Sequence, residues 1–327
     1  MPQLNQTPNS TPWCHLRIGG TVPLLLAGLL ASLAMAQQPG QASFRSPEMA
    51  SVALVQAAQR NDEKALLEIL GPDGKQIIAS GDTIEDRNDR ANFVEKYQEM
   101  HRLVNEPDGS TTLYIGAKNW PTPIPIVNKD GAWYFDTLSG KQEVLFRRIG
   151  QNETSAIHLC QDLAAAQQDY FSLRQGQYAK AIFSTEGKRD GLYWKAGTGE
   201  PQSPIAPLVA SALAKGYINH QEGGPIAYCG YFFRILTRQG KQAPGGAMDY
   251  SVKGRLTKGF AIVAYPAEYR SSGVMTFIVF RDGDVLQKDL GRATVAVARV
   301  MKDYNPGPSW QKAEDRQLEA SVGENPR

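Results

Sequence analysis

Acidic residues are concentrated in the segment SGDTIEDRNDR, residues 80–90, whose carboxylates are those of Asp82, Glu85, Asp86 and Asp89. Calcium binds several oxygen ligands supplied by a tight loop, so such a segment is a natural place to look for a metal site. The segment lacks the glycine turn and the terminal bidentate glutamate of an EF-hand. We therefore predict no metal site: the acids form a loop and a helix N-cap, and Arg87 and Arg90 offset their charge.

Histidines and candidate nucleophiles are sparse. Beyond the N-terminal leader, His101, His158 and His220 do not pair at zinc spacing with one another or with a cysteine. No serine lies in a Gly-x-Ser-x-Gly turn, and no glycine-rich run matches a phosphate-binding loop. The sequence therefore predicts no cofactor, and it favours a binding role over an enzymatic one.

Aromatic residues of the first half form a candidate ligand pocket. An aromatic cluster on a curved sheet either fills the core or lines a hollow that takes a small apolar ligand, and the sequence leaves both alternatives open. The residues of this cluster are Phe93, Tyr97, Tyr114, Trp120 and Trp133.

A second candidate surface is the segment GKRDGLYWK, residues 187–195, which contains Lys188, Arg189, Tyr193 and Trp194. Exposed aromatic rings beside basic side chains can recognise glycans, acidic partners or anionic lipid. The alternative is that Tyr193 and Trp194 cover a neighbouring sheet.

Cys160 and Cys229 are candidate disulfide partners. Cys160 lies on the apolar stripe of a predicted helix. Cys229 is expected on the same face of a predicted strand as Tyr231 and Phe233. Both sulfurs are then expected to enter one gap between helix and sheet. Export to an oxidising compartment would allow the bond. The alternative is two separate buried thiols.

The N-terminus has the pattern of a secretory signal peptide. A polar stretch with Arg17 is followed by the uncharged apolar run VPLLLAGLLASLAM and by Ala34-Met35-Ala36, a small-x-small cleavage site. The apolar run is shorter than the roughly 20 residues of a membrane-spanning helix. We predict a signal peptide at residues 1–36, a periplasmic or secreted protein, and no transmembrane segment after cleavage.

The charge balance argues against a general nucleic-acid binder. The chain has 35 Lys+Arg against 33 Asp+Glu, and the leader accounts for one of the basic residues, Arg17. A nucleic-acid binder would need a basic face. We predict no nucleic-acid partner.

Helix and strand signals divide the chain into two α+β halves. The first half is expected to have a flexible lead-in segment at residues 37–45, helices near 46–60, 62–70 and 86–102, strands near 111–117, 124–127 and 132–136, and a helix that ends at Gly150. The second half is expected to have a long helix from Gln151, strands within 227–237, 259–267, 273–280 and 284–291, and a last helix near 293–304.

A long helix followed by four strands can bury its own apolar stripe against one face of a sheet. We therefore predict domains at residues 46–149 and 150–310, followed by a disordered tail at 311–327. The alternative is that the helix before Gly150 continues into the second domain and joins the two domains into one stiff body.

The motifs NETSAIHLCQDLAAAQQDYF and FAIVAYPAEYRSSGVMTFIVFRDGDVLQKDLG lie in the second half. This region, Gln151 to Gly291, resembles the soluble part of type IV pilins and type II secretion pseudopilins. The resemblance implies a long helix packed on a four-stranded antiparallel sheet. In the first half, Ser46 to Thr137 with the motif DGAWYFDT is similar to the nuclear-transport-factor-2-like cone, which implies helices and a curved antiparallel sheet.

Motifs along the whole mature chain point to one further family. They are LGPDGKQIIASGD, DRNDRANFVEKY, NWPTPIPIV, WYFDT, RRIGQNE, GKRDGLYW and SGVMTFIV. Over Phe44 to Trp310 the chain is similar to a bacterial exported family of unknown function, the domain-of-unknown-function family 2950. This resemblance implies an exported bacterial protein and supplies no activity.

We therefore expect an exported α+β protein of the cell envelope that acts as a non-catalytic binding or assembly module. Its expected partner is an envelope protein or a small apolar ligand. The alternative is an envelope enzyme, a hydrolase or isomerase, that uses the N-terminal cone pocket. The sequence leaves the oligomeric state open.

Overall fold

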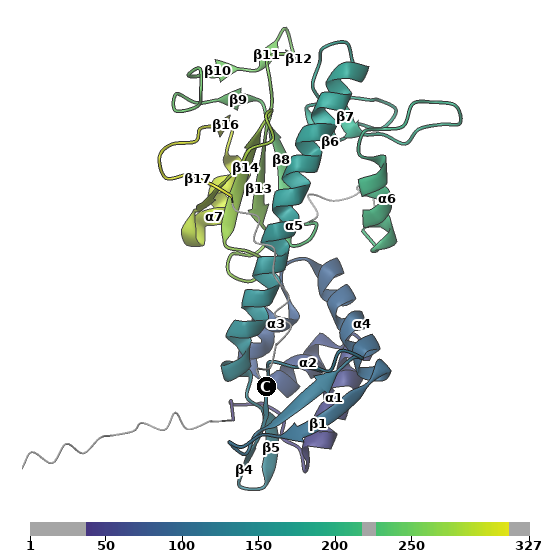
Figure 1. The fold of residues 1–327 in the computed structure, drawn as a ribbon, viewed down its shortest axis with the longest axis vertical. Coiled ribbons are helices and arrows are strands. Elements are labelled where there is room, and N and C mark those ends of the chain that lie inside the picture. Colours follow the sequence, from purple (N-terminus) through teal and green to yellow (C-terminus); the bar gives the residue numbers. More distant parts are fainter. Residues whose placement is uncertain (1–36, 218–226, 314–327) are drawn as a thin grey trace, which may run out of the picture. The chain divides into compact units, whose positions relative to one another are not determined.

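The computed structural model describes residues 37–217 and 227–313 (Figure 1). The predicted signal peptide, His220 and most of the predicted tail lie outside these residues. Within them the fold is α+β, as expected, with helices first, two main antiparallel sheets after them, and one long helix between the strands of these two sheets in the chain.

The segment predicted to be a flexible lead-in is tied to the core. Gln41 is buried, and its side-chain Nε2 donates hydrogen bonds to the carbonyls of Ile69 and Phe135. Phe44 forms an antiparallel bridge with Trp133. The prediction of flexibility for residues 37–45 was wrong because these long-range hydrogen bonds have no local sequence signal.

Four α-helices and a short 3-10 turn precede the first sheet. Their bounds are α1 Pro47–Gln59, α2 Glu63–Leu70, the turn Pro72–Gly74, α3 Lys75–Ile78 and α4 Thr83–Glu99. Ser46, Asp62 and Asp82 cap α1, α2 and α4, each accepting a backbone N–H of the first turn. Such local caps explain why the starts of α1 and α2 were predicted closely.

The first sheet has the order β1-β2-β4-β5, with β3 paired to β2, and all pairs are antiparallel. Its strands are β1 His101–Asn105, β2 Thr111–Ile115, β3 Trp120–Pro121, β4 Ile126–Lys129 and β5 Ala132–Phe135. Leu113, Ile126 and Phe135 are buried against α1, α2 and α4 in one core. Strand β1 begins where the sequence predicted the end of a helix.

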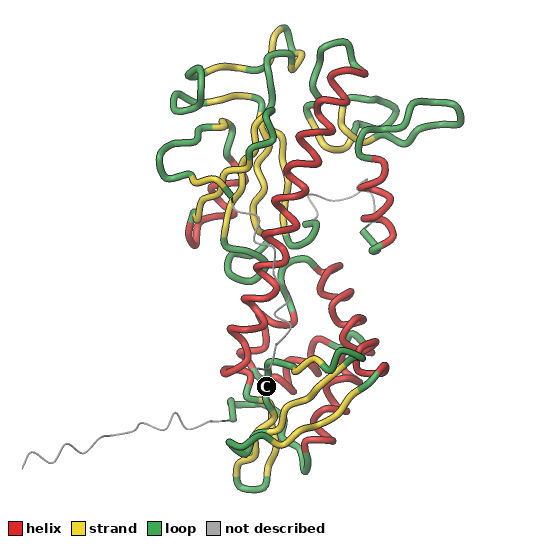
Figure 2. The backbone as a smooth tube through the Cα atoms, viewed as in Figure 1, coloured by secondary structure: helices red, strands yellow, loops and turns green. Residues whose placement is uncertain are grey.

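Helix α5 is a single helix of 37 residues, Thr137–Leu173, in place of the two helices predicted to meet at Gly150 (Figure 2). Asp136 caps its start by accepting the N–H of Ser139. A glycine within a helix costs only about 1 kcal/mol, so Gly150 does not end it. The predicted domain boundary at 149/150 falls inside this helix.

The second half of α5 packs on an antiparallel sheet of order β17-β15-β14-β13-β8. The strands are β8 Tyr231–Leu236, β13 Ala261–Pro266, β14 Met275–Phe280, β15 Val285–Asp289 and β17 Gln311–Lys312. Four of them correspond to the predicted strands. The fifth, β17, lies in the segment predicted to be a disordered tail, so that prediction was wrong for Gln311 and Lys312, which pair with β15.

This sheet is covered on both faces. Ile262, Phe277 and Val279 pack towards α5, and Val263 and Ile278 pack with α7 (Thr294–Val300). Every residue of β13 is consequently buried. The resemblance implied one helix on one face, whereas α7 covers the other.

Smaller elements complete the described part of the chain. They are β6 Ala181–Phe183, β7 Gly191–Tyr193, α6 Ala206–Ala214, β9 Arg238–Gln239, β10 Met248–Asp249, β11 Ser251–Val252, β12 Arg255–Leu256, the 3-10 turn Gly291–Ala293 and β16 Asp303–Tyr304. Strands β9 to β12 lie in sequence between β8 and β13, so the four predicted strands are not consecutive along the chain.

Candidate functional site

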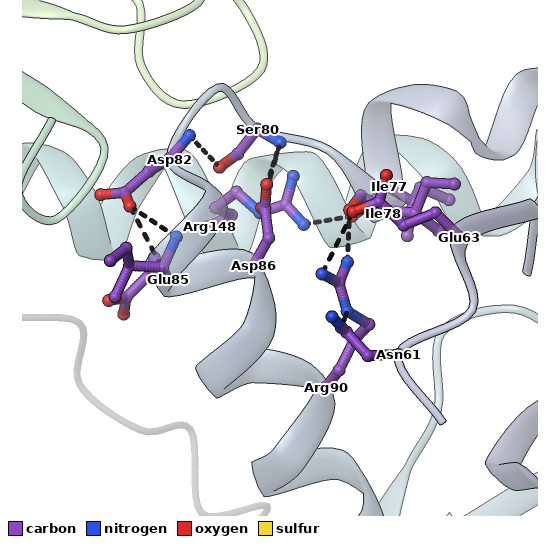
Figure 3. A network of polar contacts seen from close by, with 11 residues as sticks. Asn61, Glu63, Ile77, Ile78, Ser80, Asp82, Glu85, Asp86, Arg90 and Arg148 are labelled. Atoms are coloured by element: carbon purple, nitrogen blue, oxygen red, sulfur yellow. Dashed lines mark hydrogen bonds and ion pairs between the residues drawn. The ribbon is translucent and has the colours of Figure 1, made fainter. Parts of the chain in front are cut away.

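The acidic segment at the start of α4 forms a buried polar network, drawn in Figure 3. Asp82, only 2% exposed, accepts the N–H groups of Ile84 and Glu85 at 3.2 and 3.1 Å through Oδ1. Its Oδ2 accepts the hydroxyl of Tyr217 at 2.7 Å and the N–H of Gly230 at 3.1 Å. One carboxylate therefore caps a helix and holds two segments that are far away in the sequence.

Asp86 holds the loop that precedes α4. The carboxylate is 4% exposed, and both of its oxygens accept the N–H of Ser80 at 3.0 Å. Burial raises the pKa of Asp86, although the hydrogen bonds from Ser80 and the charges of Arg148 and Arg90 act in the opposite direction. Both buried acids are thus engaged by donors of the protein itself.

Two arginines surround this network and bind backbone carbonyls. Arg90 donates to Ile78 O at 2.8 Å and pairs with Glu63 at 3.3 Å. Arg148, from α5, donates to the carbonyls of Gln76 and Ile77. The two guanidinium groups satisfy carbonyls around the C-terminal end of α3, where the helix leaves them without partners.

Asp89 is an exposed acid beside the network. Desolvation by the surrounding protein, together with the charges of Glu85 and Asp86, raises the pKa of Asp89 to about 6, although its side chain is exposed to solvent. Because water reaches the exposed carboxylate, this shift has a small energetic effect.

Tyr217 and Cys229 lie beside Asp82, and neither is activated as a nucleophile. Burial and the neighbouring Asp82 raise the pKa of the Tyr217 hydroxyl, and burial raises the pKa of the Cys229 thiol to about 11. Both groups therefore carry their protons at neutral pH, and the thiolate that nucleophilic chemistry requires is not formed. Over residues 37–217 and 227–313, no group of three or more His, Cys, Asp and Glu side chains is arranged to hold a metal.

Of the five aromatic residues of the predicted pocket, Tyr97 belongs to the first core and Phe93 and Trp133 pack against it. Tyr97 is buried and stacks on His101 with ring centroids 3.8 Å apart, while its centroid is 6.4 Å from that of Phe93. Trp133 packs at the border of the first core. The guanidinium carbon of Arg102 lies 4.6 Å from the ring centroid of Tyr114. Trp120 is exposed.

Three large apolar side chains, two of them in the first half of α5, are exposed. Trp120 is 59% exposed, and both Leu138 and Phe146 are 65% exposed. The guanidinium of Arg147 lies 5.6 Å from the Trp120 ring centroid, which links β3 to the helix turn that also carries Phe146. We call Trp120, Leu138 and Phe146 the α5 apolar face. Leu138 and Phe146 were missed from the sequence, because an exposed and a buried apolar residue in a helix give the same pattern.

The segment predicted as a recognition surface is partly used for internal packing. Trp194 is buried, and its Nε1 donates to Pro201 O at 3.1 Å. Arg189 pairs with Glu200 at 2.6 Å and lies 5.8 Å from the Trp194 ring centroid. Tyr193 packs edge-on against Phe183, and Lys188 remains exposed.

Cys160 and Cys229 are free thiols, so the predicted disulfide is not formed. Cys160 lies within α5 and is fully buried in the core between this helix and the second sheet. Cys229 precedes β8, in a tight turn where its φ is 50° and Tyr228 bridges Tyr231. The expectation assumed that side chains alternate between the two faces of the sheet from β8 back to Cys229. They do not alternate through this turn.

Comparison with known proteins identifies one family. A family model described as "Protein of unknown function (DUF2950)" matches residues 41–313. Neither the curated proteins nor the solved structures contain a match to this sequence. Among the described residues, no helix combines the length and the apolar character needed to cross a membrane.

Proposed function

Since the chain belongs to the DUF2950 family, whose description assigns no activity, we propose from its own geometry that it is a non-catalytic binding module of the bacterial cell envelope. The observation that carries this proposal is the exposure of Trp120, Leu138 and Phe146 on the α5 apolar face. Large apolar side chains that a folded domain leaves exposed are candidate contacts for a protein partner. The partner that fits it is an envelope protein with an apolar surface of its own.

The buried acids support a structural role for the polar network. The carboxylate oxygens of Asp82 and Asp86 accept hydrogen bonds from within the protein. The thiol of Cys229 is protonated at neutral pH. An enzyme needs an acid or base that is free to act on a bound substrate. Asp89 is accessible, and a hydrolase or isomerase would have to use a group of this kind.

Export and the two likenesses are part of the same proposal. The apolar run before Ala36 supports export to the periplasm or beyond. The packing of α5 on an antiparallel sheet supports a pilin-like second half, and the helices followed by an antiparallel sheet support a nuclear-transport-factor-2-like first half. Mass spectrometry of the exported protein should find a mature N-terminus at Gln37; a chain that keeps residues 1–36 would contradict export with cleavage.

Site-specific photo-crosslinking in the envelope tests the binding role. A photoreactive phenylalanine analogue replaces Phe146 in the full chain, and the matched control replaces the exposed Asp169 on the second half of α5. We expect Phe146 to give a discrete crosslinked protein band that Asp169 does not give, and the band should disappear when Trp120→Glu is added. No band at Phe146, or the same band from both positions, would refute the α5 apolar face as the binding surface.

A further inference from the structure

A cavity of about 240 Å³ lies along β8, the edge strand of the second sheet, to whose outer side no strand of residues 37–217 and 227–313 is hydrogen-bonded, although β6 lies near it. Its lining residues are Arg234, Ile235, Leu236, Thr237, Arg238 and Lys302. The cavity is independent of the α5 apolar face and of the Asp82 network. Half of its lining side chains are cationic, which is unusual for the edge of a β-rich core.

Arg234 is a half-buried cation that lacks a carboxylate partner in the described part of the chain. Its Nη2 donates to the carbonyls of Ala298 and Met301 at 2.8 and 2.5 Å, at the C-terminal end of α7. Its Nε is buried and has no hydrogen-bond partner among the same residues. Because burying an unpaired charge or donor is costly, the position requires a compensating interaction.

The remaining charges do not balance Arg234. Arg238 pairs through Nε with Asp303 at 2.8 Å, and the exposed Lys302 precedes that aspartate in the chain. Asp303 and Asp249, which lies opposite Arg238 in the β9–β10 pair, are two carboxylates beside three cationic side chains. This excess of positive charge attracts an anion into the cavity.

The backbone of β8 adds a donor on the same side. Gly230 O accepts the N–H of Ala267 at 2.9 Å, and the alternation of an antiparallel ladder then directs the backbone groups of Arg234 and Leu236 towards β13. The N–H and C=O of Ile235 consequently point to the open edge. Ile235 belongs to the cavity lining with Arg234, Arg238 and Lys302, so its outward N–H is a candidate donor at this edge.

We propose that this cavity binds a small molecule through an oxyanion, either a phosphate or a carboxylate group. Forked guanidinium groups and a backbone N–H are the donors that such oxygens accept, and the cavity can hold the anion with part of the group that carries it. The hydrogen bonds to α7 explain the position of Nη2 of Arg234. They do not explain why Lys302, Arg238 and Ile235 line the same cavity.

Nuclear magnetic resonance of the ¹⁵N-labelled mature chain tests this proposal. Inorganic phosphate and acetate are titrated separately at constant ionic strength, and the signals of the Ile235 amide and the Arg234 Nε–H are followed. We expect both signals to shift with saturation for at least one anion. Saturation by phosphate alone assigns a phosphate ligand, and saturation by acetate assigns a carboxylate.

Lys302→Gln should weaken the binding about tenfold, the loss expected for one charge-assisted hydrogen bond. Lys302 is exposed, so this change does not threaten the fold. The matched control is Lys118→Gln, which removes the same charge from an exposed position next to β3 and should leave the affinity unchanged. Shifts that do not saturate with either anion, or equal affinities for the two variants, would overturn the proposal.

Discussion

At the residue scale, single polar groups join segments that are far apart in the sequence. Asp82 binds Tyr217 and Gly230 in addition to capping α4, and Gln41 binds the carbonyls of Ile69 and Phe135. Each of these side chains is buried, so a lost partner cannot be replaced by water. Their contribution therefore exceeds that of similar residues on the surface.

Asp82→Ala should destabilise the protein by about 3 kcal/mol, since it removes the cap, leaves the Gly230 N–H without a partner and leaves the Tyr217 hydroxyl only its longer hydrogen bond to Glu85 at 3.2 Å. Asp62→Ala is the matched control, because Asp62 caps α2 by accepting only the N–H of Ala65, and should cost about 1 kcal/mol. Urea unfolding of both variants gives the comparison. Equal losses would show that the contacts of Asp82 beyond its helix contribute nothing.

Asp89→Asn should change how stability depends on pH. The pKa of Asp89 is raised in the folded state to about 6, so the folded state favours the protonated acid. The associated stability is complete below about pH 4, the ordinary value for aspartate, and is lost as pH rises from there through 6.

The variant should therefore match the native protein at pH 4 and exceed it at pH 7, by under about 1 kcal/mol because water screens the exposed side chain. Urea unfolding at both pH values measures the difference, with Asp169→Asn as a control for the removal of an exposed charge. An Asp89→Asn variant that is less stable than the native protein at pH 7 would contradict the raised pKa.

At the element scale, α5 shows why a helix can run through a glycine. Arg148 of its first half binds the carbonyls of Gln76 and Ile77, and Asn152 and Glu153 bind backbone groups of Ser272, Val274 and Met275. These contacts fix the turns on both sides of Gly150. Tertiary contacts therefore outweigh the helix propensity of a single residue.

Gly140 is the position in α5 where glycine is required for packing. A Cβ atom there would lie 2.3 Å from Pro123 O and 2.7 Å from the Cα of Ile124, so the chain before β4 packs directly on the helix backbone. Gly140→Ala should destabilise the protein by about 2 kcal/mol, in spite of the higher helix propensity of alanine.

The control is Gln142→Ala in the same helix, an exposed position where the change should stay within about 0.5 kcal/mol. Thermal unfolding followed by circular dichroism compares the two variants. A Gly140→Ala protein as stable as the native chain would mean that the segment before β4 can move away at no cost.

At the scale of the whole molecule, the described residues contain separate hydrophobic cores. One core joins α1, α2 and α4 to the first sheet, and two others cover the opposite faces of the second sheet. The two-domain division is therefore a proposal that rests on these cores, with α5 contributing residues on both sides of the proposed boundary.

A fragment of residues 150–313 should fold cooperatively, because it keeps the second sheet, α7 and the helix residues Asn152 and Glu153 that bind the sheet backbone. A fragment of residues 161–313 is the control, since it also lacks Ala156, Ile157 and Cys160 of the core and should be less stable. Urea unfolding and limited proteolysis measure both. A protease-sensitive 150–313 chain without a cooperative transition would contradict an independent second domain.

The sequence by itself determined the features that depend on local physics. Ser46 and Asp62 fixed helix starts, alternating β-formers located β8, β13, β14 and β15, and the family motifs matched the family found over residues 41–313. Caps, propensities and alternation act between residues close in the chain, so they can be recognised without a structure.

The tertiary structure decided which groups meet. It paired Asp82 with Tyr217, left Cys160 and Cys229 as free thiols, covered the second face of the sheet with α7, and placed Arg234 beside Lys302 at an open edge. It also left Phe146 and Leu138 exposed, although the helix pattern would equally suit burial. These outcomes depend on contacts between distant segments, and local preferences carry no information about which distant segment will supply the partner.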